Sequence, residues 1–412
     1  MGRRATAIRL RFLLAALAAA ALCVALLGSA SLRADTSGPL KVSIAFLHEQ
    51  LPGPIPLSLV EPVATDLGLA GARLAIGENN TTGRFLNQQY ALKEVMVPAG
   101  GDLAGAVKSL IAGGTTLIVA DLSAKRLLEI ADLPEAKDAV ILNTAAEDDS
   151  LRIQDCRANL FHIIPSRAMK ADALAQYLTF KRWQRWVLVS GTGEGDKAFA
   201  AAMRRAAKRF GDKILDERSF TYTAGSRRTD TGEQQIQKQM IDLTQRLPDY
   251  DIMIVADESQ VFGDYLPYRT WDPRLVAGTQ GLVPTAWHRS MEQWGATQVQ
   301  HRFTAAAKRW MYERDYTAWA GVRSFGEAVT RIGKANPQAI KAFLLSDQFQ
   351  LGAFKGVGLS FRHWDQQLRQ PILLSSPLML VSVSPQDGFL HPGTNLDTLG
   401  YDAPETKCNL NP

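Results

Sequence analysis

Two short apolar runs in this chain end in acidic residues, and these ends are where its side chains could do chemistry. One run lies in ILNTAAEDDS and the other in DIMIVADESQ, and the acids that follow them are Glu147, Asp148, Asp149, Asp257 and Glu258. Carboxylates gathered in one place repel one another unless a positive group lies between them. Hard cations take six or more oxygen ligands, mainly carboxylates, carbonyls and water. The pattern therefore favours either a cation site, with Asp148, Asp149 and Asp257 as predicted metal ligands, or the binding of an amine.

A purely structural role for the same acids stays open. Asp and Ser are common at strand ends and helix N-caps, so Asp148 or Asp149 would serve to cap the next turn. Three nearby basic side chains would neutralise the other acids, namely Arg152, Arg157 and Arg167. The sequence alone does not choose between these interpretations.

The segments around the acids alternate between apolar strands and helices. One such series begins at Leu40, and the pattern restarts near residue 159 and continues to Asp257. This alternation predicts an α/β fold with two consecutive, doubly wound Rossmann-like units. In such sheets ligands bind outside the carboxyl ends of the strands. Besides the five acids, the residues predicted to bind a ligand there are Glu49, Asp121, Ser123, Thr144 and Tyr265.

Motifs of the common enzyme classes are absent from the sequence. It has no G-x-x-x-x-G-K-[ST] phosphate loop, no H-E-x-x-H metal motif and no G-x-S-x-G nucleophile motif, and its six histidines are scattered. We therefore expect a binding protein and not an enzyme.

The first 30 residues have the pattern of a secretory signal peptide. Basic residues precede an apolar run from Phe12 to Leu27, which is shorter than the ~20 residues of a membrane-spanning helix. Removing this leader, which carries four arginines and no acid, lowers the net charge from +5 to +1 (5 − 4). We therefore expect a periplasmic protein that binds no nucleic acid and whose mature part is not embedded in the membrane.

Two cysteines remain after the leader, Cys156 and Cys408. In an oxidising compartment an isolated pair favours a disulfide. The bridge would tie the C-terminal tail to the middle of the chain.

Longer segments of the mature chain resemble the type I periplasmic solute-binding proteins of ABC importers, the group with branched-chain amino acid and amide receptors. The resemblance rests on the order of three segments: GARLAIGENNTTGRFLNQQYALKEV, NLFHIIPSR and DYTAWAGVRSFGEAVTRIGKANPQAIKAFLLSDQFQLGAFKGVGLSF. More narrowly, YLPYRTWDPRLVAG, LRQPILL and LDTLGYD resemble a subgroup found with pyrroloquinoline quinone-dependent alcohol oxidation systems, part of which is linked to lanthanide uptake.

The resemblance implies two lobes joined by three crossovers, with a small solute held in the cleft between them. The implied parts are a signal peptide (1–30), a first lobe (40–163 plus 288–352), a second lobe (164–287 plus 353–400), a tail (401–412) and crossovers near 163–166, 283–287 and 354–359.

The resemblance also implies partners, the permease and ATPase subunits of an importer. Together with the acidic strand ends it favours a solute that is a metal cation such as a lanthanide, and no other cofactor is expected. Two alternatives remain. One is a receptor for an amino acid, an amide or an alcohol-derived metabolite, and the other is a periplasmic sensor or accessory protein outside transport.

Overall fold

The computed structural model describes residues 38–51, 63–221 and 230–410. Residues Leu40–Pro412 form one compact unit. The predicted signal peptide lies outside the described residues. None of the helices in the described part combines the length and the apolar character that crossing a membrane requires.

The first lobe is built on a five-stranded parallel sheet with the strand order β2-β1-β3-β4-β5. Its strands are β1 (Leu40–Gln50), β2 (Gln88–Pro98), β3 (Leu117–Asp121), β4 (Val140–Asn143) and β5 (Leu160–His162). The helices associated with it are α2 (Leu69–Leu86), α3 (Leu103–Ala112), α4 (Ala124–Ala131), α9 (Ala296–Ala307), α10 (Glu313–Ile332) and α11 (Pro337–Leu344).

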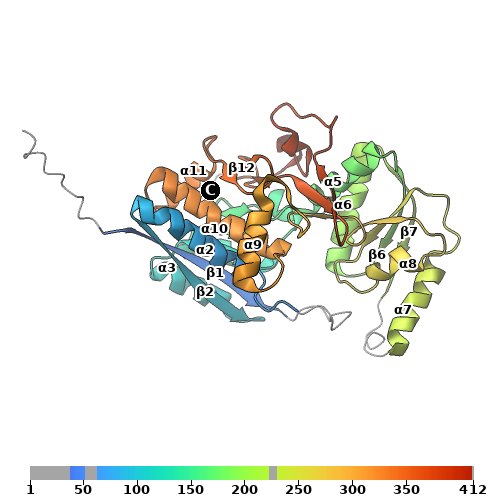
Figure 1. The fold of residues 1–412 in the computed structure, drawn as a ribbon, viewed down its shortest axis with the longest axis horizontal. Helices are drawn as coiled ribbons and strands as arrows, with labels where there is room; N and C mark the ends of the chain where they lie inside the picture. Colours follow the sequence, from blue (N-terminus) through green and yellow to red (C-terminus); the bar gives the residue numbers. More distant parts are fainter. Residues whose placement is uncertain (1–37, 52–62, 222–229, 411–412) are drawn as a thin grey trace, which may run out of the picture. The chain divides into compact units, whose positions relative to one another are not determined.

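Both faces of this sheet are buried, because alternate residues of its strands enter different cores. Ile44 and Phe46 of β1 pack in one core with residues of α2 and α10, which lie side by side in Figure 1. Ala45 and Leu47 pack in a second core with residues of α3 and α4. A parallel sheet that is covered on both faces needs strands that are apolar throughout, which explains the continuous apolar runs of the sequence.

The second lobe repeats this plan with a four-stranded parallel sheet in the order β7-β6-β8-β9. Its strands and helices are α5 (Arg167–Phe180), β6 (Arg185–Ser190), α6 (Glu194–Phe210), β7 (Lys213–Ser219), α7 (Asp230–Leu243), β8 (Ile252–Ala256), α8 (Leu266–Arg269) and β9 (Leu275–Gly278). Trp186 and Leu188 of β6 pack in a core with residues of α5 and α6, and Val187 and Val189 pack in a core with Met240 of α7. The predicted pair of doubly wound units is confirmed.

Two small antiparallel sheets lie next to the passages of the chain between these lobes. One has the order β10-β14-β15, with β10 (Val283–Thr285), β14 (Ile372–Ser375) and β15 (Leu380–Ser384). The other has the order β11-β12-β13, with β11 (Leu351–Gly352), β12 (Gly358–Phe361) and β13 (Leu368–Arg369). The chain therefore passes between the lobes after β5, at β10 and between β13 and β14.

The third of these passages differs from the prediction. Leu359 and Phe361, which were expected at or beyond a crossover near 354–359, pack in the first-lobe core, as does Leu368. Only at Ile372 and Leu374 does the chain enter a second-lobe core. The third crossover therefore lies at about 369–372, because the glycine-rich stretch before it forms strand β12 of the first lobe.

Glutamine side chains hold the third crossover beside the first. The amide nitrogen of Gln366 donates to the carbonyls of Arg157 and Leu160, at 3.0 and 2.6 Å. That of Gln367 donates to Ile164 O at 3.1 Å, and that of Gln370 donates to Ile163 O at 2.6 Å. All three amides are buried, so these bonds satisfy backbone carbonyls that water does not reach.

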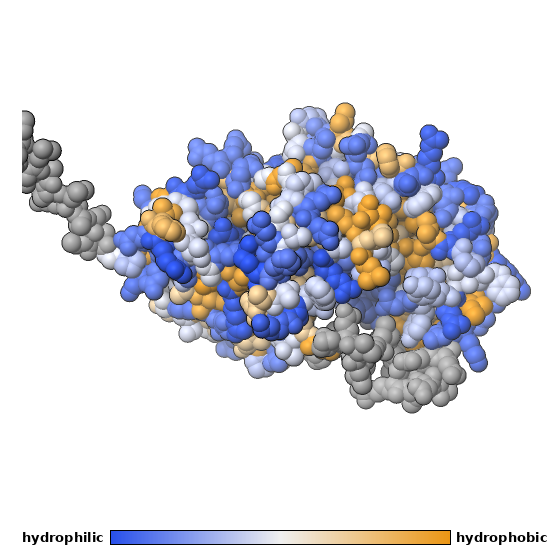
Figure 2. Space-filling model, viewed as in Figure 1, coloured by the Kyte–Doolittle hydropathy of each residue, from blue (hydrophilic) through white to orange (hydrophobic). Residues whose placement is uncertain are grey.

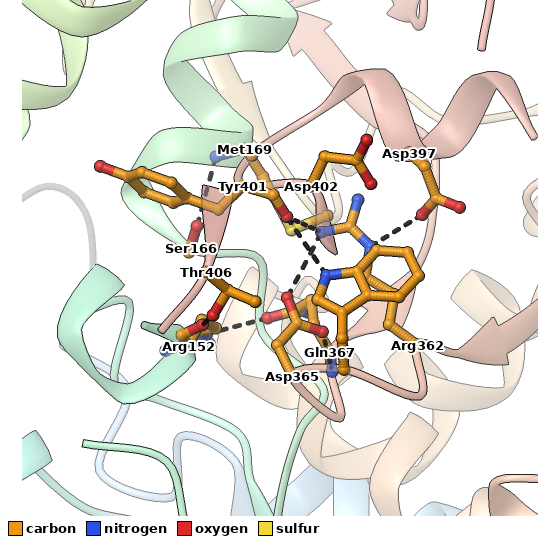
Figure 3. Close-up of polar contacts among 12 residues, drawn as sticks. Arg152, Ser166, Met169, Arg362, Asp365, Gln367, Asp397, Tyr401, Asp402 and Thr406 are labelled. Carbon is orange, nitrogen blue, oxygen red and sulfur yellow. Dashed lines mark hydrogen bonds and ion pairs between the residues drawn. The ribbon is translucent and has the colours of Figure 1, made fainter. Parts of the chain in front are cut away.

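The C-terminal segment contacts both lobes. The carbonyl of Gly400 accepts hydrogen bonds from Arg205 and Arg209 of α6. Thr406 Oγ1 donates to Arg152 O at 2.8 Å in the first lobe (Figure 3). The predicted disulfide between Cys156 and Cys408 is present. The tail is therefore a fourth connection between the lobes, in addition to the three crossovers.

Candidate functional site

The carboxyl ends of β1 and β3 carry paired charges in the first lobe. Asp121, which ends β3, is buried and accepts from His48 Nδ1 at 3.1 Å and from the Arg314 guanidinium. Glu49 accepts from Gly100 N at 2.9 Å and lies 3.3 Å from Arg126 Nε. Both predicted acids are thus at the sheet edge where they were expected, and each has a basic neighbour.

A cluster of three charges joins the loop after β4 to helices α5 and α10. Lys170 Nζ, on α5, donates to Glu147 Oε1 at 2.6 Å and to Glu313 Oε2 at 2.9 Å. The Lys170 side chain is only 8% exposed. Glu313 also accepts from Ala286 N at 2.5 Å, next to the second crossover. The Lys170 ammonium of the second lobe therefore binds two carboxylates of the first lobe. One is Glu147, in the loop after β4, and the other is Glu313, on α10.

Burial and charge shift the pKa values of this cluster in different directions. Burial raises the pKa of Glu147, with Lys170 opposing the shift. Burial also disfavours the charged form of Glu313, but Lys170 and the Ala286 N–H outweigh it, so the pKa of Glu313 is lowered. Burial opposes the charged form of Lys170, yet the two carboxylates raise its pKa. The two carboxylates therefore favour the ammonium form of Lys170 in spite of its burial.

Arg167, at the start of α5, reaches acids that follow strands of both sheets. Its guanidinium makes two bonds of 2.7 Å to the carboxylate of Glu258, which follows β8. Its Nη1 lies 3.4 Å from Asp148 Oδ2, in the loop after β4. Because one guanidinium contacts both, the carboxyl ends of β4 and β8 meet at the start of α5.

The remaining acids make hydrogen bonds to backbone amides. Asp149 Oδ1 accepts from Ala168 N at 2.9 Å and so caps α5. Asp257 accepts from the amides of Val261, Phe262 and Gly263, at 2.7 to 3.0 Å. Burial raises the pKa of both carboxyl groups, and the amide hydrogen bonds oppose this shift.

The other predicted ligand-binding residues have local roles. Thr144 is buried and its hydroxyl donates to Ala120 O at 3.0 Å. Ser123 is exposed and precedes α4, where its side chain makes no capping hydrogen bond. Tyr265 is partly buried and packs against the second-lobe core that contains Met240. Among the three predicted hydroxyl residues of this group, Ser123 is therefore the exposed one.

The structure does not gather Asp148, Asp149 and Asp257 into a ligand set. Within residues 38–51, 63–221 and 230–410, no group of three or more His, Cys, Asp or Glu side chains is arranged to hold a metal ion. The oxygens of Asp257 and one oxygen of Asp149 already accept amide hydrogen bonds. The metal site remains a prediction that this geometry does not support.

The basic partners of the acids are the residues that sequence reasoning mostly missed. Of the three arginines predicted to neutralise them, Arg167 does so. Arg152 instead donates to backbone carbonyls of Ala146, Asp148 and Ile164, and Arg157 pairs with Asp132. One feature of the sequence could have identified Lys170 as a further partner of these acids. It lies three residues after Arg167 and therefore on the same side of the helix.

Comparisons with known proteins show the fold. No family model matches the chain, and no curated protein sequence matches it. Its structure is similar to a branched-chain amino acid ABC transporter periplasmic ligand-binding protein from Burkholderia xenovorans, with 15% identity, a TM-score of 0.67 and coverage of 90% of this chain and 99% of that one.

Two further solved structures agree with this finding. An ABC transporter substrate-binding protein from Sphaerobacter thermophilus has 16% identity and a TM-score of 0.67, with 88% of this chain and 100% of that one covered. A leucine-, isoleucine-, valine-, threonine- and alanine-binding protein from Brucella ovis has 16% identity and a TM-score of 0.61, with 91% and 100% covered. The chain therefore has the type I periplasmic binding protein fold.

Proposed function

We propose that this protein is the periplasmic substrate-binding component of an ABC importer and holds a small organic solute between its two lobes. The observation that carries the proposal is the contact of Arg167 with both Glu258 and Asp148, because it brings the carboxyl ends of the two sheets together. Ligands of open α/β sheets bind at those ends. The proteins with similar structures support the same role, since their names describe transport receptors.

The charges at the strand ends favour an organic solute with balanced charge over a metal cation. Each acid there already has a partner in the protein, and the partners of Asp121, Glu147 and Glu258 are basic side chains. A multivalent cation would have to displace these ammonium and guanidinium groups. An amino acid, by contrast, carries one carboxylate and one ammonium group, which would pair with one basic and one acidic side chain of these pairs.

The narrower link to pyrroloquinoline quinone-dependent alcohol oxidation rests on the sequence resemblance alone. The segments that carry it lie at residues 265–278, 368–374 and 396–402, which form α8, β9, the third crossover and the tail. The charged side chains after β4 and β8 lie outside these segments. We retain the link as a proposal about the setting of the importer, and the quinone as a compound to be tested.

A role as a sensor or accessory protein has one observation in its favour. Leu378 and Met379, in the turn between β14 and β15, are 81% and 58% exposed. Hydrophobic residues also gather in patches on the face shown in Figure 2. Exposed apolar side chains of this kind suit a protein partner, which would be the permease in an importer or an oxidase or receptor kinase otherwise.

The first test is calorimetric titration of the mature, metal-free protein with amino acids, their amides, pyrroloquinoline quinone, calcium and lanthanum. We expect one organic solute to bind, and Glu258→Gln to weaken its binding by about 10-fold because Arg167 loses its bidentate partner. The matched control is Glu217→Gln, since Glu217 makes an exposed ion pair with Arg204 on β7 and α6.

The possible results separate the alternatives. Equal affinity in Glu258→Gln and Glu217→Gln would place the solute away from the strand ends and contradict the proposal. A different result is that lanthanum binds to the unaltered protein and fails to bind when Asp148, Asp149 and Asp257 become Asn. That result would show that the solute is a metal ion and would contradict the proposal of an organic solute.

A further inference from the structure

A cavity of about 570 Å³ lies beside the third crossover, and its lining includes none of the charged residues that follow β4 and β8. Its walls come from β12 and β13 of the first lobe, from the end of β15, and from Thr394, Asn395 and Leu396 of the C-terminal segment. Pockets that bind small molecules have volumes of roughly 300–1,000 Å³. The cavity is therefore large enough for a small organic ligand.

The ionisable side chains that line this cavity are both basic: Arg369, and Lys355, whose buried amine donates to Pro371 O at 2.8 Å. Arg369 is held in place through two of its nitrogens. Its Nε donates to Asp397 at 2.9 and 3.0 Å, and its Nη1 donates to Phe361 O at 2.8 Å. Asp397 is shared with Arg362, whose Nε lies 2.8 Å from it. The third nitrogen of the Arg369 guanidinium has no partner among the described residues and is the natural donor to a ligand.

Neutral hydrogen-bonding groups and apolar surface complete the lining. Ser360, Asn395 and Gln350 supply hydroxyl and amide groups, and Pro371 and Pro385 supply apolar walls. The lining contains no carboxylate. An anion that enters therefore meets donors and positive charge without a competing acid at the surface of the cavity.

A half-exposed aromatic ring, that of Trp294, forms another wall. Trp294 has a φ of 52°, a left-handed conformation that is unfavourable for a bulky residue. Its ring packs against Gly356, where a Cβ atom would lie 2.6 Å from the ring, and Gly356 itself has a φ of 78°. The Trp294 ring is therefore held at the cavity by close packing on Gly356. A larger residue at position 356 would force the ring or the backbone to shift. The ring itself is only half buried, so its own burial does not account for this position.

We propose that this cavity is a second binding site, for a small organic anion with a carboxylate and a flat or apolar body. The carboxylate would bind the guanidinium of Arg369, and the body would lie against Trp294 and the two prolines. The cavity shares no lining residue with the strand ends where the transported solute is proposed to bind, so this proposal does not depend on that one.

The test uses benzoate as the probe, with benzamide as a neutral analogue and benzylamine as a cationic one. Binding to the mature protein is measured by saturation-transfer NMR and by titration at low salt. We expect benzoate to bind at least about 5-fold more tightly than benzamide, because a guanidinium binds a carboxylate more strongly than a neutral amide. Benzylamine should not bind detectably.

A matched pair of variants at Val357 locates the probe. Val357 lines the cavity and is 47% exposed, so both Val357→Glu and Val357→Gln should fold, which an unchanged unfolding temperature will check. The two new side chains have the same size, and only glutamate adds a negative charge. We expect Val357→Glu to weaken benzoate binding about 3-fold or more relative to Val357→Gln, through repulsion at low salt.

Each other result contradicts the proposal. Equal binding of benzoate and benzamide would show that the cavity does not select an anion. Equal effects of the two Val357 variants would show that benzoate binds elsewhere. A loss of benzoate binding in Glu258→Gln would assign the anion to the strand ends between the lobes.

Discussion

Two acidic strand ends that look alike in the sequence have different roles in the two lobes. After β4, Glu147 and Asp148 pair with Lys170 and Arg167 on α5, a helix of the other lobe. After β8, Asp257 binds the backbone amides of its own loop. Glu147 and Asp148 therefore connect the lobes and Asp257 shapes one loop, whereas Glu258, also after β8, shares the Arg167 guanidinium with Asp148. An acidic cluster in a sequence does not by itself indicate a metal site, because backbone amides and basic side chains satisfy carboxylates equally well.

The largest effect is expected from removing the ammonium that connects the lobes. Lys170→Met leaves Glu147 and Glu313 without their common partner, and breaking a buried pair costs about 3–5 kcal/mol. The free energy of unfolding, measured with urea, should fall by this amount. The triple variant with Glu147→Gln and Glu313→Gln should recover most of it. A loss below about 1 kcal/mol in Lys170→Met would show that the cluster does not hold the lobes together.

A smaller and local effect is expected at the second strand end. Asp257→Ala removes the acceptor of three amide hydrogen bonds, and we expect a loss of about 2–3 kcal/mol. Amide hydrogen exchange should become faster at residues 261–263 and stay unchanged after β4. Faster exchange in both lobes would contradict the separation of the two roles.

Buried Lys355 should make the stability of the protein depend on pH. Its pKa also responds to two of the charges that connect the lobes, those of Glu313 and Lys170. Burial lowers the pKa of Lys355 to about 7, with Glu313 opposing and Lys170 adding to the shift. Between pH 7 and its usual pKa near 10.5, the unfolded chain binds a proton at this amine that the folded protein does not. Stability should therefore rise with pH across this window, by at most about 5 kcal/mol.

The comparison of unfolding free energies at pH 7 and pH 10 checks this expectation. Lys355→Met should show less of the rise than the unaltered protein. In Lys170→Met the pKa of Lys355 should increase, because a neighbouring positive charge is gone, so the rise should begin at higher pH. An identical pH profile in all three proteins would contradict the lowered pKa of Lys355.

The smallest effect is expected at Asp148. Its side chain is 42% exposed and lies 3.4 Å from Arg167, so Asp148→Asn should change the free energy of unfolding by about 0.5 kcal/mol or less. Added salt should reduce even this difference. A change above about 2 kcal/mol would show that Asp148 contributes as much as Glu147 does and would remove the distinction between them.

Much of the architecture could be predicted from the sequence, because the information is local. Continuous apolar runs such as those of β3 and β8 are needed wherever a sheet is covered on both faces, and helices between them require parallel strands. The pairing of Cys156 with Cys408 could be predicted because the third cysteine, Cys23, lies in the predicted signal peptide. The positions of Asp121, Glu147 and Asp257 at strand ends could also be predicted, because each acid ends or follows an apolar run.

The roles of these acids were decided only by the tertiary structure. Lys170 is 23 residues from Glu147 and 143 residues from Glu313, and no local pattern specifies which carboxylate an ammonium reaches across such distances. The third crossover was placed too early, because a glycine-rich strand and a crossover look alike until the packing of Leu359 and Phe361 is known. The sequence determined which residues stand at the strand ends, and the contacts between distant segments decided whether each carboxylate joins two lobes or holds one loop.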